Sequence, residues 1–346
     1  MKTWTDQILR GGSLSSSEAA SVAEELLSSK VADEDKADFL AAMHRRGETP
    51  DEIQFFATSF LRHAEPFEVH PDLGPVLDVC GTGGDKLGLF NVSTAVMFVA
   101  AGAGARVVKH GNRGITSKSG GADVLEALGI SIDAPLDRLH GMLEESGATF
   151  LFAPRFHPSF KAVAPARKLL AQRGDASIFN MLGPLLNPAR PAYQLTGVFS
   201  ENLLPLYAQV LPKLGRRRAW VVHGKAGPDA VMDEISTLGP TRIVDVGPDG
   251  ASEKVFSPED LGVPFGDLSD LRGGDAMENA ELLTQLLKGH RQGSARDLVI
   301  VNAAASILVT GLTDDWVEAK ERAEESIDSG KAIQVLLKMR RASSQS

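Results

Sequence analysis

The sequence predicts an α/β protein, with a small all-helical N-terminal domain and a larger domain built on a mostly parallel central sheet flanked by helices. Two observations predict this fold class. In the first 72 residues, apolar side chains recur at helical spacing, and from residue 75 onward short strand-like runs alternate with helix-like ones. Such alternation is typical of a parallel sheet with helices on both faces.

Two of the N-terminal helices are marked by their first residues. Ser15 with Glu18, and Thr49 with Glu52, have the spacing of a capping box, and a proline follows Thr49 at the first helical position. After each cap the apolar residues recur on one face, namely Ala19, Val22, Ala23, Leu26 and Leu27, then Ile53, Phe56, Ala57, Phe60 and Leu61. These faces predict helices that pack against one another.

The rest of the chain supplies the predicted sheet and its cover. Strands are expected at residues 76–80, 105–108, 149–152, 219–222 and 242–246. Residues 298–308 are apolar on nearly all sides, which predicts a helix buried in the core. Residues 247–274 are rich in glycine, proline and aspartate and are expected to form a surface excursion, and residues 340–346 a frayed end.

Composition excludes several classes of protein. A chain of 346 residues with 43% apolar content can bury a large core, and its net charge of −9 makes a nucleic-acid partner an unfavourable expectation. The single cysteine, Cys80, excludes a disulfide framework and a cysteine-rich zinc site, and fits a reducing compartment. No signal pattern or long apolar run is found, so we expect a cytoplasmic protein without a membrane partner.

The first candidate functional segment is a glycine loop between a strand and a helix. The strand at residues 76–80 is followed by Gly81, Gly83 and Gly84, where no side chain keeps an anion from the backbone amides. Asn91, Ser93 and Thr94 then open a helix, whose first turn favours negative charge. The spacing matches neither a Walker loop nor a dinucleotide fingerprint. Taken alone, it leaves an ordinary strand-to-helix turn as an alternative.

A second loop repeats this design one strand later, at residues 107–123. Lys109 and Arg113 add positive charge, Asn112 and three hydroxyl groups add hydrogen-bonding groups, and four glycines keep the backbone accessible. Loops after consecutive strands of an open α/β sheet face one crevice, where ligands bind in such sheets. The two loops therefore predict a site for a polyanionic ligand.

The motifs of these loops, and several further along, together resemble the anthranilate phosphoribosyltransferases of tryptophan biosynthesis, which have a nucleoside phosphorylase/phosphoribosyltransferase-like fold. The resemblance rests on residues 81–85, 91–94, 109–113, 122–129, 156–158, 167–168, 178–180, 182–188, 233–236, 302–304 and 329–332. It covers nearly the whole chain. It implies a helical domain at 1–72 joined by part of 165–190, a phosphoribosyl-binding domain at 73–340, a tail at 341–346 and a homodimer formed through the helical domain.

The activity implied by the resemblance is transfer of the 5-phosphoribosyl group of phosphoribosyl pyrophosphate to anthranilate, with Mg²⁺, the second step of tryptophan biosynthesis from chorismate. Phosphoribosyl pyrophosphate would be bound by Gly81, Gly84, Asp85, Leu89, Asn91, Val92, Ser93, Thr94, Lys109, Ser117 and Gly121. Anthranilate would be bound by Gly81, Asn112 and Arg167, and the metal by Ser93, Asp233 and Glu234. A guanidinium pairs with a carboxylate in a bidentate geometry, which suits Arg167 to an ortho-carboxylated amine.

Some assignments stay open at the level of sequence. No nucleophile is needed, and His110 could line the acceptor pocket, accept the proton lost after attack, or be structural. The chain departs from the family pattern at Leu89, Gly121, residues 173–177 and residues 231–232. Alternatives are a transferase or nucleoside phosphorylase with a different acceptor, although the phosphorylase signature is absent, and a non-catalytic homologue that binds nucleic acid.

Overall fold

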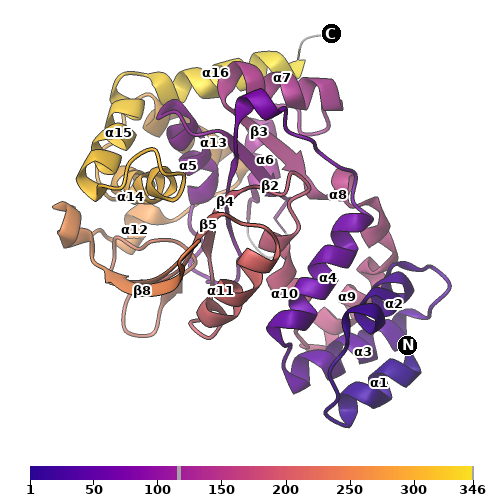
Figure 1. Ribbon diagram of the computed structural model, residues 1–346. Helices are drawn as coiled ribbons and strands as arrows, with labels where there is room; N and C mark the ends of the chain where they lie inside the picture. Colours follow the sequence, from indigo (N-terminus) through magenta and orange to yellow (C-terminus); the bar gives the residue numbers. More distant parts are fainter. Residues whose placement is uncertain (115–117, 345–346) are drawn as a thin grey trace.

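The computed structural model describes residues 1–114 and 118–344 as a helical region beside a sheet covered by helices (Figure 1). The sheet runs in the order β3-β2-β1-β4-β5-β7-β8, and β6 pairs with β5. Its strands are β1 (Leu77–Gly81), β2 (Val107–Gly111), β3 (Ala148–Phe152), β4 (Tyr193–Gly197), β5 (Arg218–Lys225), β6 (Val231–Met232), β7 (Thr241–Gly247) and β8 (Gly250–Phe256). The first five of these are mutually parallel, which confirms the predicted fold class.

All five predicted strands exist, with shifted ends, but three strands were missed: the two-residue β6, the edge strand β8 and, within the parallel part of the sheet, β4. Its centre carries Gln194 and Thr196, two polar residues that break the apolar pattern of a buried strand. Both are fully buried because the fold supplies partners: Gln194 donates to the Pro184 carbonyl at 2.7 Å and accepts from Arg216 at the same distance. Polar side chains tolerated by tertiary hydrogen bonds cannot be recognised from local pattern.

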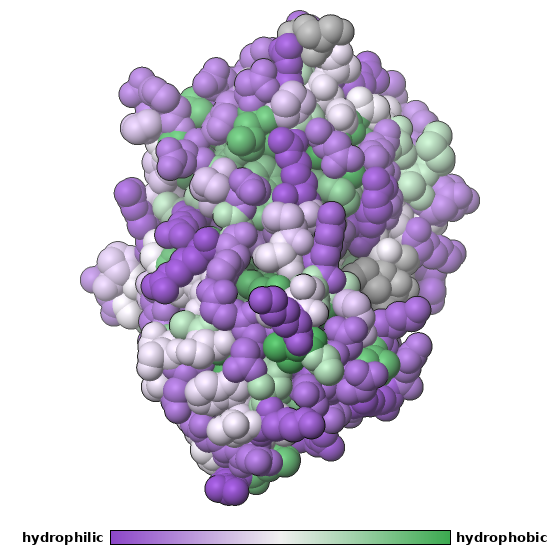
Figure 2. All heavy atoms as spheres, turned by 90° about the vertical axis from the view of Figure 1, so that its right-hand side faces the viewer, coloured by the Kyte–Doolittle hydropathy of each residue, from purple (hydrophilic) through white to green (hydrophobic). Residues whose placement is uncertain are grey.

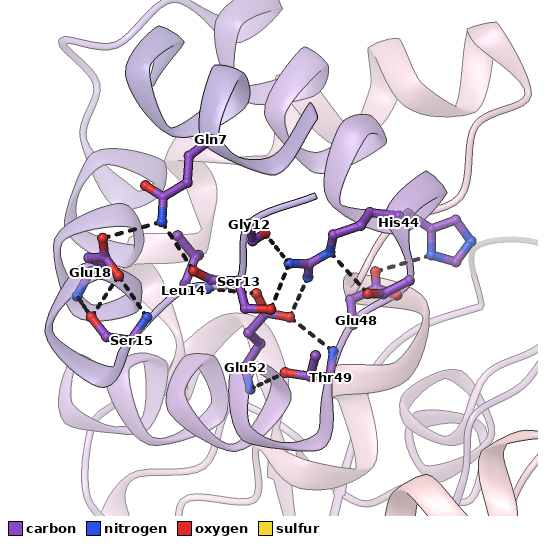
Figure 3. A network of polar contacts seen from close by, with 12 residues as sticks. Gln7, Gly12, Ser13, Leu14, Ser15, Glu18, His44, Glu48, Thr49 and Glu52 are labelled. Atoms are coloured by element: carbon purple, nitrogen blue, oxygen red, sulfur yellow. Dashed lines mark hydrogen bonds and ion pairs between the residues drawn. The ribbon is translucent and has the colours of Figure 1, made fainter. Parts of the chain in front are cut away.

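The helical region holds α1 (Lys2–Leu9), α2 (Ser16–Leu27), α3 (Asp33–Arg46) and α4 (Pro50–Arg62). Both predicted capping boxes are present. Glu52 extends its box into a buried network: it accepts from the backbone N–H of Leu14 at 2.9 Å and forms an ion pair with Arg46, which also donates to the Gly12 carbonyl (Figure 3). This network joins the loop between α1 and α2 to the C-terminus of α3 and to the N-terminus of α4.

The helical region shares its core with later segments. One apolar cluster contains Ile8, Phe56 and Phe60 from the N-terminal helices, Leu170 and Leu211 from much later in the chain, and one face of the sheet. The later segments are α9 (Ala164–Arg173), α10 (Phe179–Leu182) and α11 (Leu203–Lys213), with the short 3-10 turns η2 (Pro158–Ala162) and η3 (Gly183–Leu185). Helix α8 (Ala153–Phe156) and the 3-10 turn η1 (Pro71–Leu73) place Phe156 and Leu73 against the other apolar cluster.

A second cluster covers the other face of the sheet. Its helices are α5 (Val92–Gly102), α6 (Gly121–Ala127), α7 (Leu136–Ser146), α13 (Ala276–Leu287), α14 (Ser294–Val309), α15 (Trp316–Asp328) and α16 (Lys331–Ser344). The expected buried helix is confirmed as α14, in which residues 298–309 are all buried. Of the described helices, none is long and apolar enough to cross a membrane, and hydrophilic residues predominate on the face shown in Figure 2.

Of two expectations for exposed segments, one is confirmed and one was wrong. Residues 247–274 lie mostly at the surface, as expected, and they contain strand β8, the 3-10 turn η4 (Pro258–Leu261) and helix α12 (Leu268–Leu271). Strand β8 escaped prediction because it is an edge strand with most side chains exposed. The end of the chain is not frayed as far as Ser344, since α16 continues to that residue and buries Ala342; residues 345–346 lie outside the description.

Candidate active site

Two loops at the carboxyl edge of the sheet form the centre of the site. Strands β1 and β2 are parallel neighbours that end at Gly81 and Gly111, so the loops that follow leave the sheet at the same edge. The side-chain amide of Asn91, after the first loop, donates to the Ser119 carbonyl of the second at 3.1 Å. The two glycine loops predicted from sequence are therefore in direct contact.

Lys109 provides a buried positive charge beneath these loops. The residue is 4% exposed, and its ammonium donates to the Val79 carbonyl at 2.5 Å and to the Ser93 hydroxyl at 3.1 Å. Ser93 lies in the first turn of α5, where backbone N–H groups and the helix dipole also favour an anion. The Lys109 ammonium and the N-terminus of α5 therefore both favour an anion at the same place, beside Ser93.

Three acidic side chains meet on the other side of the first loop. The backbone N–H of Gly83 donates to Asp233 at 2.7 Å, and the charge of Asp233 acts on the neighbouring Glu234. The carboxyl groups of Asp85 and Asp233 are close enough that each shifts the pKa of the other. All the residues that the resemblance assigns to metal therefore surround the loop that would hold phosphate.

The charge balance of this cluster suits a divalent cation. Burial raises the pKa of Asp233 and of Glu234, and burial together with the neighbouring charge of Asp233 raises the pKa of Asp85 to about 7. Carboxylate and hydroxyl oxygens are ligands that Mg²⁺ prefers. Within residues 1–114 and 118–344, no group of three or more acidic, histidine or cysteine side chains is arranged to enclose a metal alone. A cation here would need oxygens from a substrate or water as well.

Other residues assigned to phosphoribosyl pyrophosphate line the same loops. The Thr94 hydroxyl is buried and has no hydrogen-bond partner among the described residues, so it is available to a ligand. A side chain at Gly121 would lie 3.4 Å from that hydroxyl. Gly84 has a φ of +94°, which favours glycine, and Val92 begins α5. Ser117 lies outside the described residues.

A cavity of about 400 Å³ opens beside the loops. Its walls come from the ends of β1 and β2 and from η2, α9 and α10, and they are mainly apolar and aromatic. The three residues that the resemblance assigns to anthranilate all line it, namely Gly81, Asn112 and Arg167. Because Gly81 also begins the first loop, the cavity and the loop adjoin each other.

Arg167 is placed to receive an anion in this cavity. Its guanidinium lies 5.1 Å from the centre of the Phe179 ring, and burial lowers its pKa. Among the residues that the structure describes, no carboxylate pairs with it. A partly buried guanidinium that lies over an aromatic ring and lacks a carboxylate partner is suited to bind a planar carboxylate ligand.

Two histidines lie along the same cavity. The rings of His110 and His157 are 5.3 Å apart, and His157 contacts the Leu186 carbonyl at 2.9 Å. Burial, followed by the charges of His157 and Lys109, lowers the pKa of His110 to about 3. Its Nε2 has no partner within the described part of the chain. His110 is therefore neutral near pH 7, which favours a lining role over proton acceptance.

The positions that depart from the family pattern leave these features in place. Leu89 forms a backbone bridge with Arg272, and Val231 and Met232 form β6, which leads directly into Asp233. In residues 173–177, Arg173 pairs with Asp38 of α3 at 2.7 Å, and none of these residues is among those that line the cavity. Through Arg173, residues 173–177 thus contact the helical region.

The sequence did not single out some residues that the fold brings to the site. Phe160 and Phe179 meet edge to face at 5.7 Å in the cavity wall, and Asn279 contacts Asn91 from the far end of the chain. The motifs that contain His157 and Phe179 were noted as part of the resemblance, without a role for either residue. Asn279 carried no local signal, because a single asparagine in the first turn of a helix is common.

Comparison with known proteins identifies the family. Residues 2–64 match the helical bundle domain of a glycosyl transferase family, and residues 73–333 match its α/β domain. The anthranilate phosphoribosyltransferase of Anaeromyxobacter dehalogenans is 44% identical over 95% of both chains. The chain belongs to the anthranilate phosphoribosyltransferase family. The enzyme of that name from Moorella thermoacetica is 43% identical over 98% of this chain and 97% of its own.

Solved structures of anthranilate phosphoribosyltransferases have the same fold. That of Thermus thermophilus is 40% identical, covers 98% of both chains and superposes with a TM-score of 0.89. That of Saccharomyces cerevisiae, in complex with phosphoribosyl pyrophosphate and Mg, is 28% identical over 99% of this chain and 97% of its own, with a TM-score of 0.86. Membership of the family thus extends over both the helical and the α/β parts.

Proposed function

We propose that this protein transfers the 5-phosphoribosyl group of phosphoribosyl pyrophosphate to the amine of anthranilate, giving N-(5-phosphoribosyl)anthranilate and pyrophosphate, with Mg²⁺. The observation that carries the proposal is the position of Gly81. It begins the anion-binding loop and also lines the cavity that contains Arg167. A donor bound on the loop and an acceptor bound in the cavity would meet at this residue.

The donor site consists of the two loops and the residues beneath them. Lys109, the Thr94 hydroxyl and the amides around Gly84 would bind phosphate oxygens, because they combine positive charge with open hydrogen-bonding groups. Asp233 and Glu234, with the Ser93 hydroxyl, would hold the metal, which supplies Lewis-acid stabilisation of the pyrophosphate oxygens. The other residues assigned to the donor by resemblance are Gly81, Asp85, Leu89, Asn91, Val92, Ser117 and Gly121.

The chemical step requires electrostatic stabilisation more than a nucleophile. The bond between the anomeric carbon and pyrophosphate breaks as a new bond to the anthranilate nitrogen forms, and the nitrogen then loses a proton. Negative charge accumulates on the leaving group, close to the Lys109 ammonium and the N-terminus of α5. The apolar cavity keeps water from the activated sugar.

The acceptor would be oriented by Arg167 and Asn112. The guanidinium would pair with the ortho-carboxylate while the aromatic wall contacts the ring, which leaves the amine directed to the adjoining loop. With a pKa of about 3, His110 is a poor acceptor for the released proton at neutral pH, and we assign it to the cavity wall.

We further propose that the protein is cytoplasmic and forms a homodimer through its helical domain, which we place at residues 1–72 with part of 165–190. The buried thiol of Cys80 fits a reducing compartment, and Leu9 on α1 is 68% exposed, as a contact with a second subunit would require. Sedimentation of wild type and of Leu9→Glu tests the dimer. A monomeric wild type would contradict it.

The decisive experiment follows the fluorescence of anthranilate. Purified protein is mixed with anthranilate, phosphoribosyl pyrophosphate and Mg²⁺, and we expect a decay that requires all three components and is stopped by a chelator. Arg167→Ala should raise KM for anthranilate at least about tenfold, because a charge-assisted bidentate pair is lost. Arg173→Ala is the matched control, since Arg173 lies on the same helix but pairs with Asp38 at the surface.

The outcomes distinguish the alternatives. No decay, with phosphoribosyl pyrophosphate still bound, would mean that the acceptor is a different molecule. An Arg167→Ala protein with unchanged kinetics would remove that residue from the acceptor site. DNA binding that weakens steeply with salt, in a protein without transferase activity, would favour a nucleic-acid-binding homologue instead.

A further inference from the structure

A buried asparagine outside both glycine loops contacts the donor site. Asn279 lies in the first turn of α13, 188 residues after Asn91, and is 2% exposed. Its side-chain N–H donates to the Asn91 amide oxygen at 2.9 Å. Its own oxygen accepts from the backbone N–H of Gly274 at the same distance, so the orientation of the Asn279 amide is fixed at both ends.

Asn91 is itself a bridge and not a cap. It occupies the N-cap position of α5, yet its side chain accepts no hydrogen bond from the first turn of that helix. Its nitrogen donates instead to the Ser119 carbonyl at 3.1 Å, across to the second loop. The Asn91 oxygen accepts from Asn279 at 2.9 Å and, over a longer distance of 3.5 Å, from the Ser119 hydroxyl. Its nitrogen is therefore the end that remains for the Ser119 carbonyl and for a ligand.

The segment before Asn279 also follows the first loop closely. The backbone N–H of Gly273 donates to the Gly88 carbonyl at 2.8 Å, and that of Phe90 donates to the Leu271 carbonyl at 3.0 Å. A β-carbon at Gly273 would lie 2.7 Å from the Leu89 carbonyl oxygen, so the backbones of these two segments are in contact. The contact of the Asn279 side chain with Asn91 adds to these backbone hydrogen bonds.

We propose that Asn279 is a positioning residue of the donor site. It holds the Asn91 amide in one orientation and thereby sets the spacing of the two loops for phosphoribosyl pyrophosphate. The inference rests on the proposed function, in which Asn91 contacts the donor. It predicts that loss of the Asn279 donor weakens the donor substrate selectively, although Asn279 does not belong to either loop.

The test compares Asn279→Asp with Asn279→Ala, Asn91→Ala and the double variant Asn91→Ala/Asn279→Asp in steady-state kinetics. The aspartate keeps the size of the side chain and an acceptor for Gly274, but it places an oxygen against the oxygen of Asn91. We expect KM for phosphoribosyl pyrophosphate to rise about tenfold in Asn279→Asp, as the loss of one well-placed hydrogen bond implies. The kcat and the KM for anthranilate should change less.

A double-variant comparison separates positioning from general damage. If Asn279 acts through Asn91, adding Asn279→Asp to Asn91→Ala should cause no further rise in KM for phosphoribosyl pyrophosphate. Thr284→Ala is the matched control on the same helix, because the Thr284 hydroxyl bonds only within α13 among the described residues. It should leave every kinetic constant near the wild-type value.

Each result bears on the proposal. A wild-type KM for phosphoribosyl pyrophosphate in both Asn279 variants, with a raised KM in Asn91→Ala, would overturn the inference and leave the proposed function standing. Wild-type values in Asn91→Ala as well would remove Asn91 from the donor site and overturn the inference with it. Additive increases in KM for phosphoribosyl pyrophosphate in the double variant would show that Asn279 does not act through Asn91. An Asn279 variant that lost kcat and melting temperature together would show a structural role only. Either result would overturn the inference. A wild-type protein without transferase activity would refute the proposed function itself.

Discussion

At the scale of single residues, Gly81 shows that the site has no room for a side chain at this position. A β-carbon at Gly81 would lie 2.3 Å from a carboxylate oxygen of Asp233, closer than non-bonded atoms approach. Asp233 is also held by the Gly83 N–H at 2.7 Å, so it cannot retreat without losing that bond. Glycine at position 81 therefore lets the acidic cluster approach the phosphate loop.

We accordingly expect Gly81→Ala to lower kcat/KM for phosphoribosyl pyrophosphate roughly 100-fold, because a shift of about an ångström in a reacting group can cost that much. The same substitution at Gly141 meets no atom within 4 Å and should be neutral. Both variants are assayed by anthranilate fluorescence at several Mg²⁺ concentrations. Equal activity in the two variants would show that Asp233 need not approach the loop.

At the scale of elements, the helical region depends on the buried carboxylate of Glu52. Burial alone would raise the pKa of Glu52, but the hydrogen bond from Arg46 and those from the backbone of Thr49 and Leu14 outweigh burial and lower it. One carboxylate thus accepts hydrogen bonds from the N-terminus of α4 and from the loop between α1 and α2, and it pairs with Arg46 at the C-terminus of α3 (Figure 3).

Glu52→Gln should reduce the free energy of unfolding at pH 7 by about 2 kcal/mol, because it leaves a buried guanidinium without its charge partner. A lowered pKa means that the contribution of Glu52 is complete above its unfolded pKa of about 4.3 and is lost as pH falls through the folded pKa. Urea unfolding of both proteins from pH 7 to pH 3 should therefore show the difference shrinking on acidification.

Glu18→Gln provides the matched comparison for this prediction. Glu18 completes the capping box of α2 in the same way, but at an exposed position. Its substitution should cost less than that of Glu52. A difference between wild type and Glu52→Gln that stays constant with pH would argue that the ionised carboxylate is not the stabilising group.

At the scale of the whole molecule, the helical region is not independent of the rest. Its core includes Val163, Leu170 and Leu211, which are contributed by α9, α11 and the residues before α9. Lys36 of α3 is fully buried and donates to the Ala162 carbonyl at 2.6 Å, immediately before α9. The helices that wall the acceptor cavity are thus part of the same core as the N-terminal helices.

A fragment of residues 1–64 should therefore fail to unfold cooperatively, although residues 2–64 match the helical bundle domain of the family. Without the later helices its apolar faces stay exposed, and fewer than about 70 residues seldom supply a sufficient core. Circular dichroism during urea titration of the fragment and of the full chain makes the comparison. A sharp transition in the fragment would show that the helices fold without α9 and α11.

The sequence by itself determined the helical N-terminus, the parallel sheet, the buried α14 and the position of the two glycine loops. These follow from spacing within a few residues: capping boxes, apolar periodicity and glycines next to a strand. The strand ends were less certain, and β4 was missed, because Gln194 is buried by virtue of distant partners.

Only the tertiary structure decided which residues share the site. The meeting of Asp233 with the loop at Gly83, and of Asn279 with Asn91, joins positions 150 and 188 residues apart. Such contacts arise from the packing of whole helices on the sheet and have no local pattern. The same packing buries His110 and lowers its pKa, which argues against proton acceptance, one of the roles that its position in the sequence left open.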